Sequence, residues 1–139
     1  MPLYTAEQLN AYDQGYLPNH LGISFTHVST DTIKAEMPIQ SFLMAANGFL
    51  HAGSVVTLAD TTAGYGCIVN LPARASGFTT VELKSNHLGT AREGTVDCVA
   101  QPAHLGKTTQ VWDAVVTHRE TGKTLALFRC TQMILYPKA

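Results

Sequence analysis

His51 and Asp60 are the two residues of this 139-residue chain whose types and positions best fit catalysis. His51 stands at the start of a predicted helix, where the backbone N–H groups of Ala52 and Gly53 have no partner within the helix. Such free donors can polarise a carbonyl oxygen or hold an oxyanion. Asp60 lies inside the same helix among apolar and small residues, where a carboxylate needs either solvent or a function. Composition alone would favour the plainer interpretation, in which a histidine opens the helix and the carboxylate faces solvent.

The spacing of this pair predicts an oligomer. His51 and Asp60 are nine positions apart, which on a helix is ~13 Å of rise and half a turn. One helix therefore cannot bring both side chains to a single small reacting centre, whereas two antiparallel copies of the helix can. If the two residues act together, the protein is at least a dimer with its sites at the subunit interface. A charged fraction of only 14%, where roughly 25% is usual, also fits a surface partly covered by another copy.

The helix that positions these residues is predicted over Ala52–Val69, because apolar side chains recur there at helical spacing. Gly64 and Gly66 each weaken a helix by about 1 kcal/mol against alanine, which predicts close packing against a sheet at these positions. After the helix the pattern changes to strands, and the short links between them predict antiparallel pairing with the last strand inside the sheet. The predicted strands are Gly77–Leu88, Gly94–His104, Thr108–His118 and Thr124–Leu135.

Shorter elements precede the central helix. Thr5 and Gln8 have the spacing of a capping box, which predicts a short helix that Gly15 and Pro18 end. The predicted segments are a helix over about 6–14, strands over 23–28 and 32–38, and a loop over about 40–50. The fold class is α+β, with an antiparallel sheet that wraps around one long helix. We expect a single domain over residues 1–139, of which about 1–18 form an N-terminal helical extension.

Composition and charge exclude several classes of function. A net charge of -1 gives no support to a nucleic-acid partner, which would call for a basic stripe. The sequence has no run of about 18 apolar residues, so no membrane span is predicted, and Met1–Tyr4 lacks the features of a signal peptide. The histidines and the three cysteines show no metal-ligand spacing, so no metal site is expected. An odd number of cysteines fits buried, reduced thiols in a cytoplasmic protein.

Residues 47–61, NGFLHAGSVVTLADT, resemble the signature of the hotdog-fold acyl-CoA thioesterases. The most similar branch is the phenylacetate-pathway and aroyl-CoA group, which includes 4-hydroxybenzoyl-CoA thioesterase and the proofreading thioesterases of aryl-siderophore synthesis. That branch reads His-Gly-Gly followed by Asp or Glu nine positions after the histidine. Further similarity to the proofreading enzymes lies in residues 85–88, 91–94, 104–106 and 110–112.

Two positions depart from the family pattern. Ala52 stands where the family usually has glycine, which keeps the N–H donor but makes the approach of a thioester tighter. Ala45 stands where the family often has an asparagine or glutamine, six positions before the histidine. Asn47, four positions before His51, either takes over that polar contact or leaves it absent.

The resemblance implies a hotdog fold and the hydrolysis of an aryl- or medium-chain acyl-CoA to the free acid and coenzyme A. The thioester carbonyl would bind the N–H groups of Ala52 and Gly53, and His51 would orient the substrate or the departing thiolate. Asp60 of the partner subunit would attack the carbonyl or activate a water, and an ordinary aspartate is ionised for either role. Coenzyme A is part of the substrate, so no cofactor is expected. The implied assembly is a dimer or a dimer of dimers.

Five further residues are implied as substrate contacts. Thr80 would position the water, and Thr61 would position the acyl group. His87 and Arg92 would contact the coenzyme A portion, and Asn47 would supply an auxiliary hydrogen bond. The plainer alternatives are ordinary strand and helix polarity for the two threonines, and a solvated surface for His87 and Arg92.

Two other functions stay open at this point. A hotdog hydratase or dehydratase also pairs a histidine with a carboxylate across helices, although its Gly-His-Phe-Pro type of motif is missing here. A non-catalytic acyl-CoA-binding module would have no evident need for Asp60. The acyl group and its carrier, coenzyme A or an acyl carrier protein, are also open. Four aromatic residues could line an apolar pocket or simply belong to the core: Phe42, Phe49, Tyr65 and Phe78.

Overall fold

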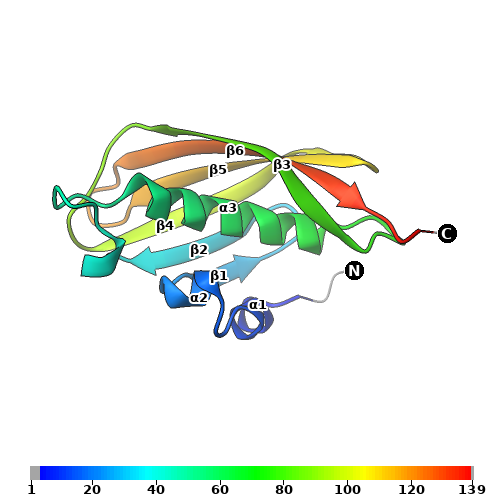
Figure 1. Ribbon diagram of the computed structural model, residues 1–139, viewed down its shortest axis with the longest axis horizontal. Coiled ribbons are helices and arrows are strands. Elements are labelled where there is room, and N and C mark those ends of the chain that lie inside the picture. Colours follow the sequence, from blue (N-terminus) through cyan, green and yellow to red (C-terminus); the bar gives the residue numbers. More distant parts are fainter. Residues whose placement is uncertain (1–3, 139) are drawn as a thin grey trace.

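A computed structural model describes residues 4–138 of the chain, whose centre is one six-stranded antiparallel sheet (Figure 1). The strand order is β1-β2-β4-β5-β6-β3. The strands are β1 (Ser24–Val28), β2 (Ile33–Pro38), β3 (Gly77–His87), β4 (Thr95–Leu105), β5 (Thr109–His118) and β6 (Thr124–Leu135). All adjacent strands pair antiparallel. The four strands predicted after the central helix are confirmed to within one residue at each end, as is their antiparallel pairing.

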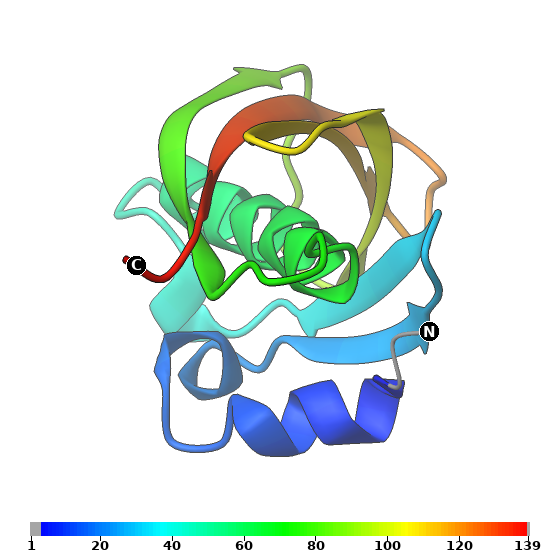
Figure 2. The ribbon, with the colours of Figure 1, turned by 90° about the vertical axis from the view of Figure 1, so that its right-hand side faces the viewer.

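The sheet curves around helix α3 (Ala52–Val69), which lies in its concave side (Figure 2). The predicted bounds of this helix are confirmed. A Cβ atom built on Gly66 would lie 2.5 Å from the ring of Trp112 on β5, so only glycine lets this ring contact the helix backbone. A Cβ atom on Gly64 would lie 3.3 Å from Phe78 on β3. Both glycines therefore mark close helix–sheet packing, and the α+β arrangement of a sheet around one long helix is confirmed.

Helix α1 (Ala6–Tyr12) begins at the predicted capping box. Thr5 Oγ1 accepts a hydrogen bond from the Gln8 N–H at 3.1 Å, and Gln8 Oε1 accepts one from the Thr5 N–H at 2.8 Å. The helix ends two residues earlier than predicted. Gly15 then reverses the chain with φ +86°, a conformation that glycine adopts without strain.

The segment from residue 16 to residue 50 holds two short elements that the sequence did not predict. Helix α2 (Leu17–His20) contains Pro18 in its first turn, where proline is tolerated because its missing N–H has no helical partner. Pro18 therefore opens a helix as well as following one. The predicted loop before α3 contains the 3-10 turn η1 (Ser41–Leu43). Residues 1–3 of the predicted N-terminal extension lie outside the described residues.

Strands β6 and β3 are neighbours at one end of the sheet order, and β3 forms the exposed edge. Strand β6 lies between β5 and β3, which confirms its predicted place inside the sheet. Strand β3 is an edge strand and is exposed along nearly its whole length, including Val81 at 57% and Leu83 at 42%. An edge strand of 11 residues with exposed apolar side chains is a template for pairing with another chain.

The cysteines are free and buried, as predicted, and lie on α3, β4 and β6: Cys67, Cys98 and Cys130. Burial raises the pKa of each thiol to about 12, so the thiols stay protonated at neutral pH. Across residues 4–138, none of the helices has the length and apolar character that crossing a bilayer requires.

Candidate active site

Asp60 lies in the middle of α3, half-buried, on the wall of a cavity of about 250 Å³. Its Oδ1 atom is buried and has no hydrogen-bond partner among residues 4–138. Burial raises the pKa of the Asp60 carboxyl above its ordinary value, because the charged form loses solvation there. A carboxylate in this state is more basic than one in water and is suited to take a proton from a water molecule.

Two of the predicted substrate contacts share this cavity with Asp60. Thr61 reaches it from α3 and Thr80 from β3. Tyr65 and Phe78, two of the four aromatic residues considered as pocket walls, also line it. The remaining wall residues are Pro18, Gly64 and Ile68. The contribution of α2 had no signal in the sequence, because Pro18 has the pattern of a helix stop.

The His51 side chain caps the helix that follows it. Its Nδ1 atom accepts a hydrogen bond from the Gly53 N–H at 2.8 Å. The accepting nitrogen carries no proton, so in the neutral ring Nε2 is the donor. The Gly53 N–H is therefore occupied, and within the described residues no hydrogen bond uses the Ala52 N–H. The start of α3 thus offers two donors, the Ala52 N–H and His51 Nε2.

His51 and Ala52 line a second cavity, of about 380 Å³, between the loop before α3 and the end of β3. His87, the last residue of β3, lines it as well. Ala45 and Asn47 reach it from the loop, so the position that departs from the family pattern and its nearby asparagine both face this cavity. Gly53 does not line it.

Asn47 has one polar atom in use and one available. Its Oδ1 atom accepts a hydrogen bond from the Phe49 N–H at 3.1 Å, which fixes the turn. No hydrogen bond within residues 4–138 uses the Nδ2 group, which is left as a donor beside the cavity. Arg92 stands at the rim, where its guanidinium carbon lies 4.2 Å from the centroid of the Phe49 ring that lines the cavity. Phe42, which was also considered as a pocket residue, is 57% exposed and lines neither cavity.

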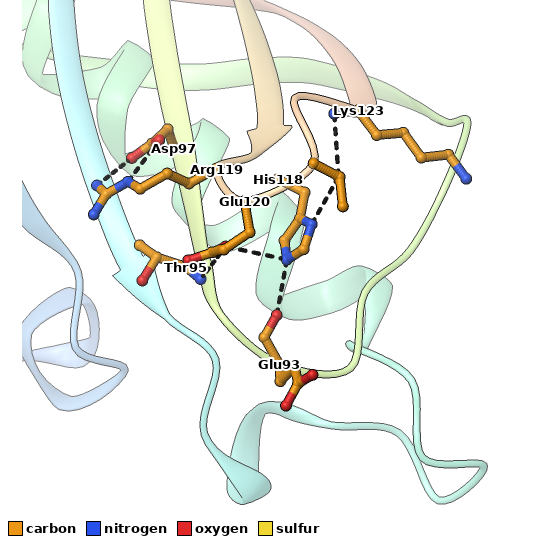
Figure 3. A network of polar contacts seen from close by, with 8 residues as sticks. Glu93, Thr95, Asp97, His118, Arg119, Glu120 and Lys123 are labelled. Atoms are coloured by element: carbon orange, nitrogen blue, oxygen red, sulfur yellow. Dashed lines mark hydrogen bonds and ion pairs between the residues drawn. The ribbon is translucent and has the colours of Figure 1, made fainter.

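A polar network holds the loop between β3 and β4 against the turn between β5 and β6 (Figure 3). His118 contacts the Glu93 carbonyl oxygen through Nε2 at 2.8 Å and Thr121 Oγ1 through Nδ1 at 2.9 Å. In the same loop, the Ala91 carbonyl oxygen accepts a hydrogen bond from the Leu50 N–H at 2.9 Å. Leu50 directly precedes the helix cap, so this network fixes the chain where it enters α3.

Among the described residues, the two cavities have no lining residue in common. His51 lines one and Asp60 lines the other, in agreement with the half turn that separates them on the helix. One chain therefore carries two half-sites in separate cavities, one with hydrogen-bond donors and one with a carboxylate. Strand β3 passes both cavities, since Thr80 lines the first and His87 the second.

A family model described as "Thioesterase superfamily" matches residues 47–125, more than half of the chain. The chain belongs to the thioesterase superfamily. This is a family of thioester hydrolases with the hotdog fold, and the six-stranded sheet around α3 is that fold. The matched residues include the whole of α3 and both halves of the candidate site, apart from Pro18 and Ala45.

Named relatives match this superfamily member over nearly its full length. The 1,4-dihydroxy-2-naphthoyl-CoA hydrolase of Escherichia coli (strain K12) is 37% identical over 134 residues, which cover 94% of this chain and 95% of the relative. The proofreading thioesterase EntH of Cronobacter turicensis is 32% identical over 133 residues and covers 94% of each chain. The crystal structure of a mutant of the thioesterase PA1618 from Pseudomonas aeruginosa superposes with a TM-score of 0.89 at 32% identity, over 95% of this chain and 94% of that one.

Proposed function

We propose that this protein hydrolyses acyl-CoA thioesters at sites shared between two subunits. The observation that carries the proposal is the division of the catalytic groups between two separate cavities in one chain. The donors at the start of α3 suit a thioester carbonyl, and the half-buried Asp60 carboxylate suits the attack on it. Two relatives that match 94% of this chain are named as a CoA-thioester hydrolase and a thioesterase, which supports the same chemistry.

The carbonyl oxygen would bind at the Ala52 N–H, at the positive end of the α3 dipole. His51 Nε2 would donate a second hydrogen bond, either to that oxygen or to the departing sulfur. Because the Gly53 N–H is held by His51 Nδ1 at 2.8 Å, its predicted part in binding the carbonyl would require the imidazole to turn away. The glycine that the family pattern usually has at this position would leave more room than Ala52 does here.

Asp60 would either attack the carbonyl carbon itself as a nucleophile or act as the base that activates an attacking water. In the second case the carboxylate takes a proton from water, the hydroxide oxygen bonds to the carbonyl carbon, and the C–S bond breaks. The thiolate of coenzyme A then leaves and takes up a proton. Thr80 would hold the water and Thr61 the acyl group, since both line the Asp60 cavity. The raised pKa of Asp60 supports the base role because it increases the basicity of the carboxylate.

The cavity at the start of α3 would take the thioester end of the coenzyme A portion. His87 lines it, and Arg92 stands over Phe49 at its rim, so both are close enough to contact the pantetheine or phosphate groups. Asn47 Nδ2 would be the auxiliary donor. Coenzyme A would be consumed as part of the substrate, and no cofactor takes part in the proposal.

The exposed edge of β3 supplies a route to the shared site. Suppose two β3 strands pair antiparallel about a two-fold axis through Lys84. Residue 81 of one strand then lies opposite residue 87 of the other, so Thr80 and the partner's His87 are one position apart along the ladder. Thr80 lines the Asp60 cavity and His87 lines the His51 cavity. The same pairing would therefore join each Asp60 cavity to the His51 cavity of the partner subunit.

For the substrate we propose an aryl- or medium-chain acyl-CoA. The names of the relatives support an aryl group, since one acts on 1,4-dihydroxy-2-naphthoyl-CoA. The assembly would be a dimer or a dimer of dimers. A cytoplasmic location, and a place in the phenylacetate branch, stay predictions from the sequence.

Release of free thiol from benzoyl-, phenylacetyl- and decanoyl-CoA, followed with a thiol reagent, tests the activity. We expect Asp60→Asn to lower kcat by about a hundredfold or more with the fold intact, and Asp60→Glu to keep part of the activity. Asp113→Asn, a change to an exposed aspartate on β5, serves as the matched control. Full turnover in Asp60→Asn would rule out the role of Asp60.

The same assay separates the other two functions. A binding module would take up acyl-CoA without releasing thiol in any variant. A hydratase or dehydratase would change the acyl chain of an enoyl- or hydroxyacyl-CoA and leave the thioester intact. Either result would overturn the proposed hydrolysis.

A further inference from the structure

A third cavity, of about 320 Å³, lies between α1 and the C-terminal half of α3. Its walls are Tyr4, Gln8, Leu9, Tyr12, Tyr65 and Ile68. We call it the α1 cavity. Figure 2 shows α1 running beside β1, at the sheet edge opposite to β3. The α1 cavity is mostly apolar, and the exposure of Tyr4 at 45% and Tyr12 at 72% leaves it open to solvent.

Tyr65 and Ile68 line both the α1 cavity and the Asp60 cavity. They follow Asp60 by five and eight positions on α3, which corresponds to ~7.5 Å and ~12 Å along the helix axis. An acyl group that runs from a thioester at Asp60 toward the end of α3 therefore meets Tyr65 first. The α1 cavity lies directly behind it.

The Tyr65 ring is held on three sides. The ring of Phe25 on β1 meets it edge-on, with centroids 4.9 Å apart and planes at 83°. The ring of Tyr12 on α1 lies on another side, with centroids 6.5 Å apart and planes at 87°. The Tyr65 hydroxyl donates a hydrogen bond to Asp13 Oδ1. Tyr65 is thus a fixed wall and not a freely rotating side chain.

Asp13 occupies a place that is unfavourable for a carboxylate. It is only 4% exposed, and its Oδ2 atom is buried without a hydrogen-bond partner among the described residues. It is also the C-cap of α1, where the helix dipole disfavours a negative charge. Burial raises its pKa, and the Tyr65 hydrogen bond opposes that rise. A residue that breaks several stability rules at once is a candidate for a functional role, and the side chain that Asp13 contacts is Tyr65.

We propose that Tyr65, held in place by Asp13, is a partition that limits the length of the acyl group, and that the α1 cavity behind it accepts the tail of a longer fatty-acyl thioester once the partition is removed. The inference rests on the proposed thioesterase function. Tyr65 is the specificity-determining residue, because it ends the space available to the acyl group. Asp13 is a positioning residue, because it acts only through the Tyr65 hydroxyl.

The test compares kcat/KM for hexanoyl-, decanoyl- and hexadecanoyl-CoA in the wild type and in two shortened variants, Tyr65→Ala and Tyr65→Leu. Tyr65→Leu keeps apolar packing against Phe25 and covers the case in which the alanine variant does not fold. We expect the decanoyl to hexanoyl ratio of kcat/KM to rise by at least about tenfold, mainly through KM, because an apolar pocket discriminates by this order per methylene group. Tyr16→Ala, at an exposed tyrosine of the N-cap of α2 that lines none of the three cavities, should leave the ratio unchanged.

Asp13 is tested with the same decanoyl to hexanoyl ratio of kcat/KM, which replacing a merely structural residue would not change. Asp13→Ala removes the acceptor of the Tyr65 hydroxyl and should raise the decanoyl to hexanoyl ratio in the same direction as Tyr65→Leu. Asp13→Asn keeps an oxygen acceptor and should keep the wild-type ratio. Equal ratios in Asp13→Ala and the wild type would remove Asp13 from the proposal.

The outcomes separate this inference from the proposed function. If the wild type hydrolyses acyl-CoA thioesters and both Tyr65 variants keep its chain-length preference within about twofold, the partition is refuted and the hydrolase function stands. If no variant releases thiol from any thioester, the proposed function fails and the partition fails with it. A rise in the ratio that Tyr65→Ala and Tyr65→Leu share would support the partition.

Discussion

Replacing Asp60 by asparagine should raise the stability of the protein while it removes the activity. Within residues 4–138, Asp60 Oδ1 is buried without a hydrogen-bond partner, and burial raises the pKa of the carboxyl. The ionised form therefore destabilises the folded state relative to the unfolded chain. An unsatisfied buried polar group costs about 1–3 kcal/mol, and a charged one more. Asparagine has nearly the same shape without the charge. We therefore expect a gain of about 1 kcal/mol near neutral pH, which raises Tm by about 4 °C in a chain of this length.

The raised pKa also fixes how this gain depends on pH. Above the folded-state pKa of Asp60 the carboxylate is charged and the destabilisation is fully present. As the pH falls through that value toward the ordinary 3.8, the folded protein takes up the proton before the unfolded chain does, and the destabilisation disappears. Thermal unfolding of both proteins between about pH 8 and about pH 3 measures the gap in Tm, which should be largest near neutrality and close on acidification.

Asp113→Asn is a matched control in which the expected change in stability has the opposite sign. Its carboxylate accepts hydrogen bonds from Arg129 at 2.6 and 2.8 Å, which lowers its pKa. Because this pair is exposed, Asp113→Asn should cost only about 0.5 kcal/mol. That cost should persist as the pH falls to 3.8 and vanish only below it. If Asp60→Asn is no more stable than the wild type at neutral pH, or if its gain does not change with pH, Asp60 is not a desolvated, unpartnered carboxylate.

Further substitutions at Gly66 and Gly64 test the packing, and substitutions at Asn47 test the loop. Gly66→Ala should lower the free energy of unfolding by about 1–3 kcal/mol in denaturant titrations, because its Cβ would lie 2.5 Å from the Trp112 ring. Gly64→Ala should cost less, because the nearest side-chain atom to its Cβ would be 3.3 Å away. Equal costs for the two variants would contradict the packing argument. If the Asn47 Nδ2 group binds substrate in the desolvated site, Asn47→Ala should reduce kcat/KM by an amount equivalent to about 1–3 kcal/mol. Asn47→Asp keeps the acceptor that fixes the turn but lacks the donor, so it should lose as much. An Asn47→Ala variant with unchanged kinetics would make Asn47 a turn residue only.

The elements of the fold were predictable from the sequence where one local signal decides them. The bounds of α3 follow from apolar periodicity and from Asn70 and Pro72, two residues just after Val69 that favour the end of a helix. The capping box at Thr5 fixed the start of α1, and Gly64 and Gly66 marked the contact with the sheet. The second helix was missed because the proline that opens it also has the pattern of a stop.

The site was predictable only in part, because its geometry depends on contacts between distant segments. The placement of His51 at the start of α3 followed from the sequence, but its side-chain cap on Gly53 did not, because Ser, Thr, Asp and Asn are the usual caps. The hydrogen bond between Tyr65 and Asp13 joins residues 52 positions apart and has no local pattern. The exposure of β3 on both faces was also hidden, because its residues have an ordinary strand composition.

Mixing subunits tests the shared site most directly. Asp60→Asn and His51→Ala chains, each nearly inactive alone, are combined by co-expression or by refolding together, and thiol release is measured. In a mixed dimer one composite site carries both changes and the other carries none, so random mixing should restore about a quarter of the wild-type activity. Each variant refolded alone is the control and should stay inactive. No recovery in dimers shown to be mixed, or full activity in a protein that elutes as a monomer, would contradict a site built from two subunits.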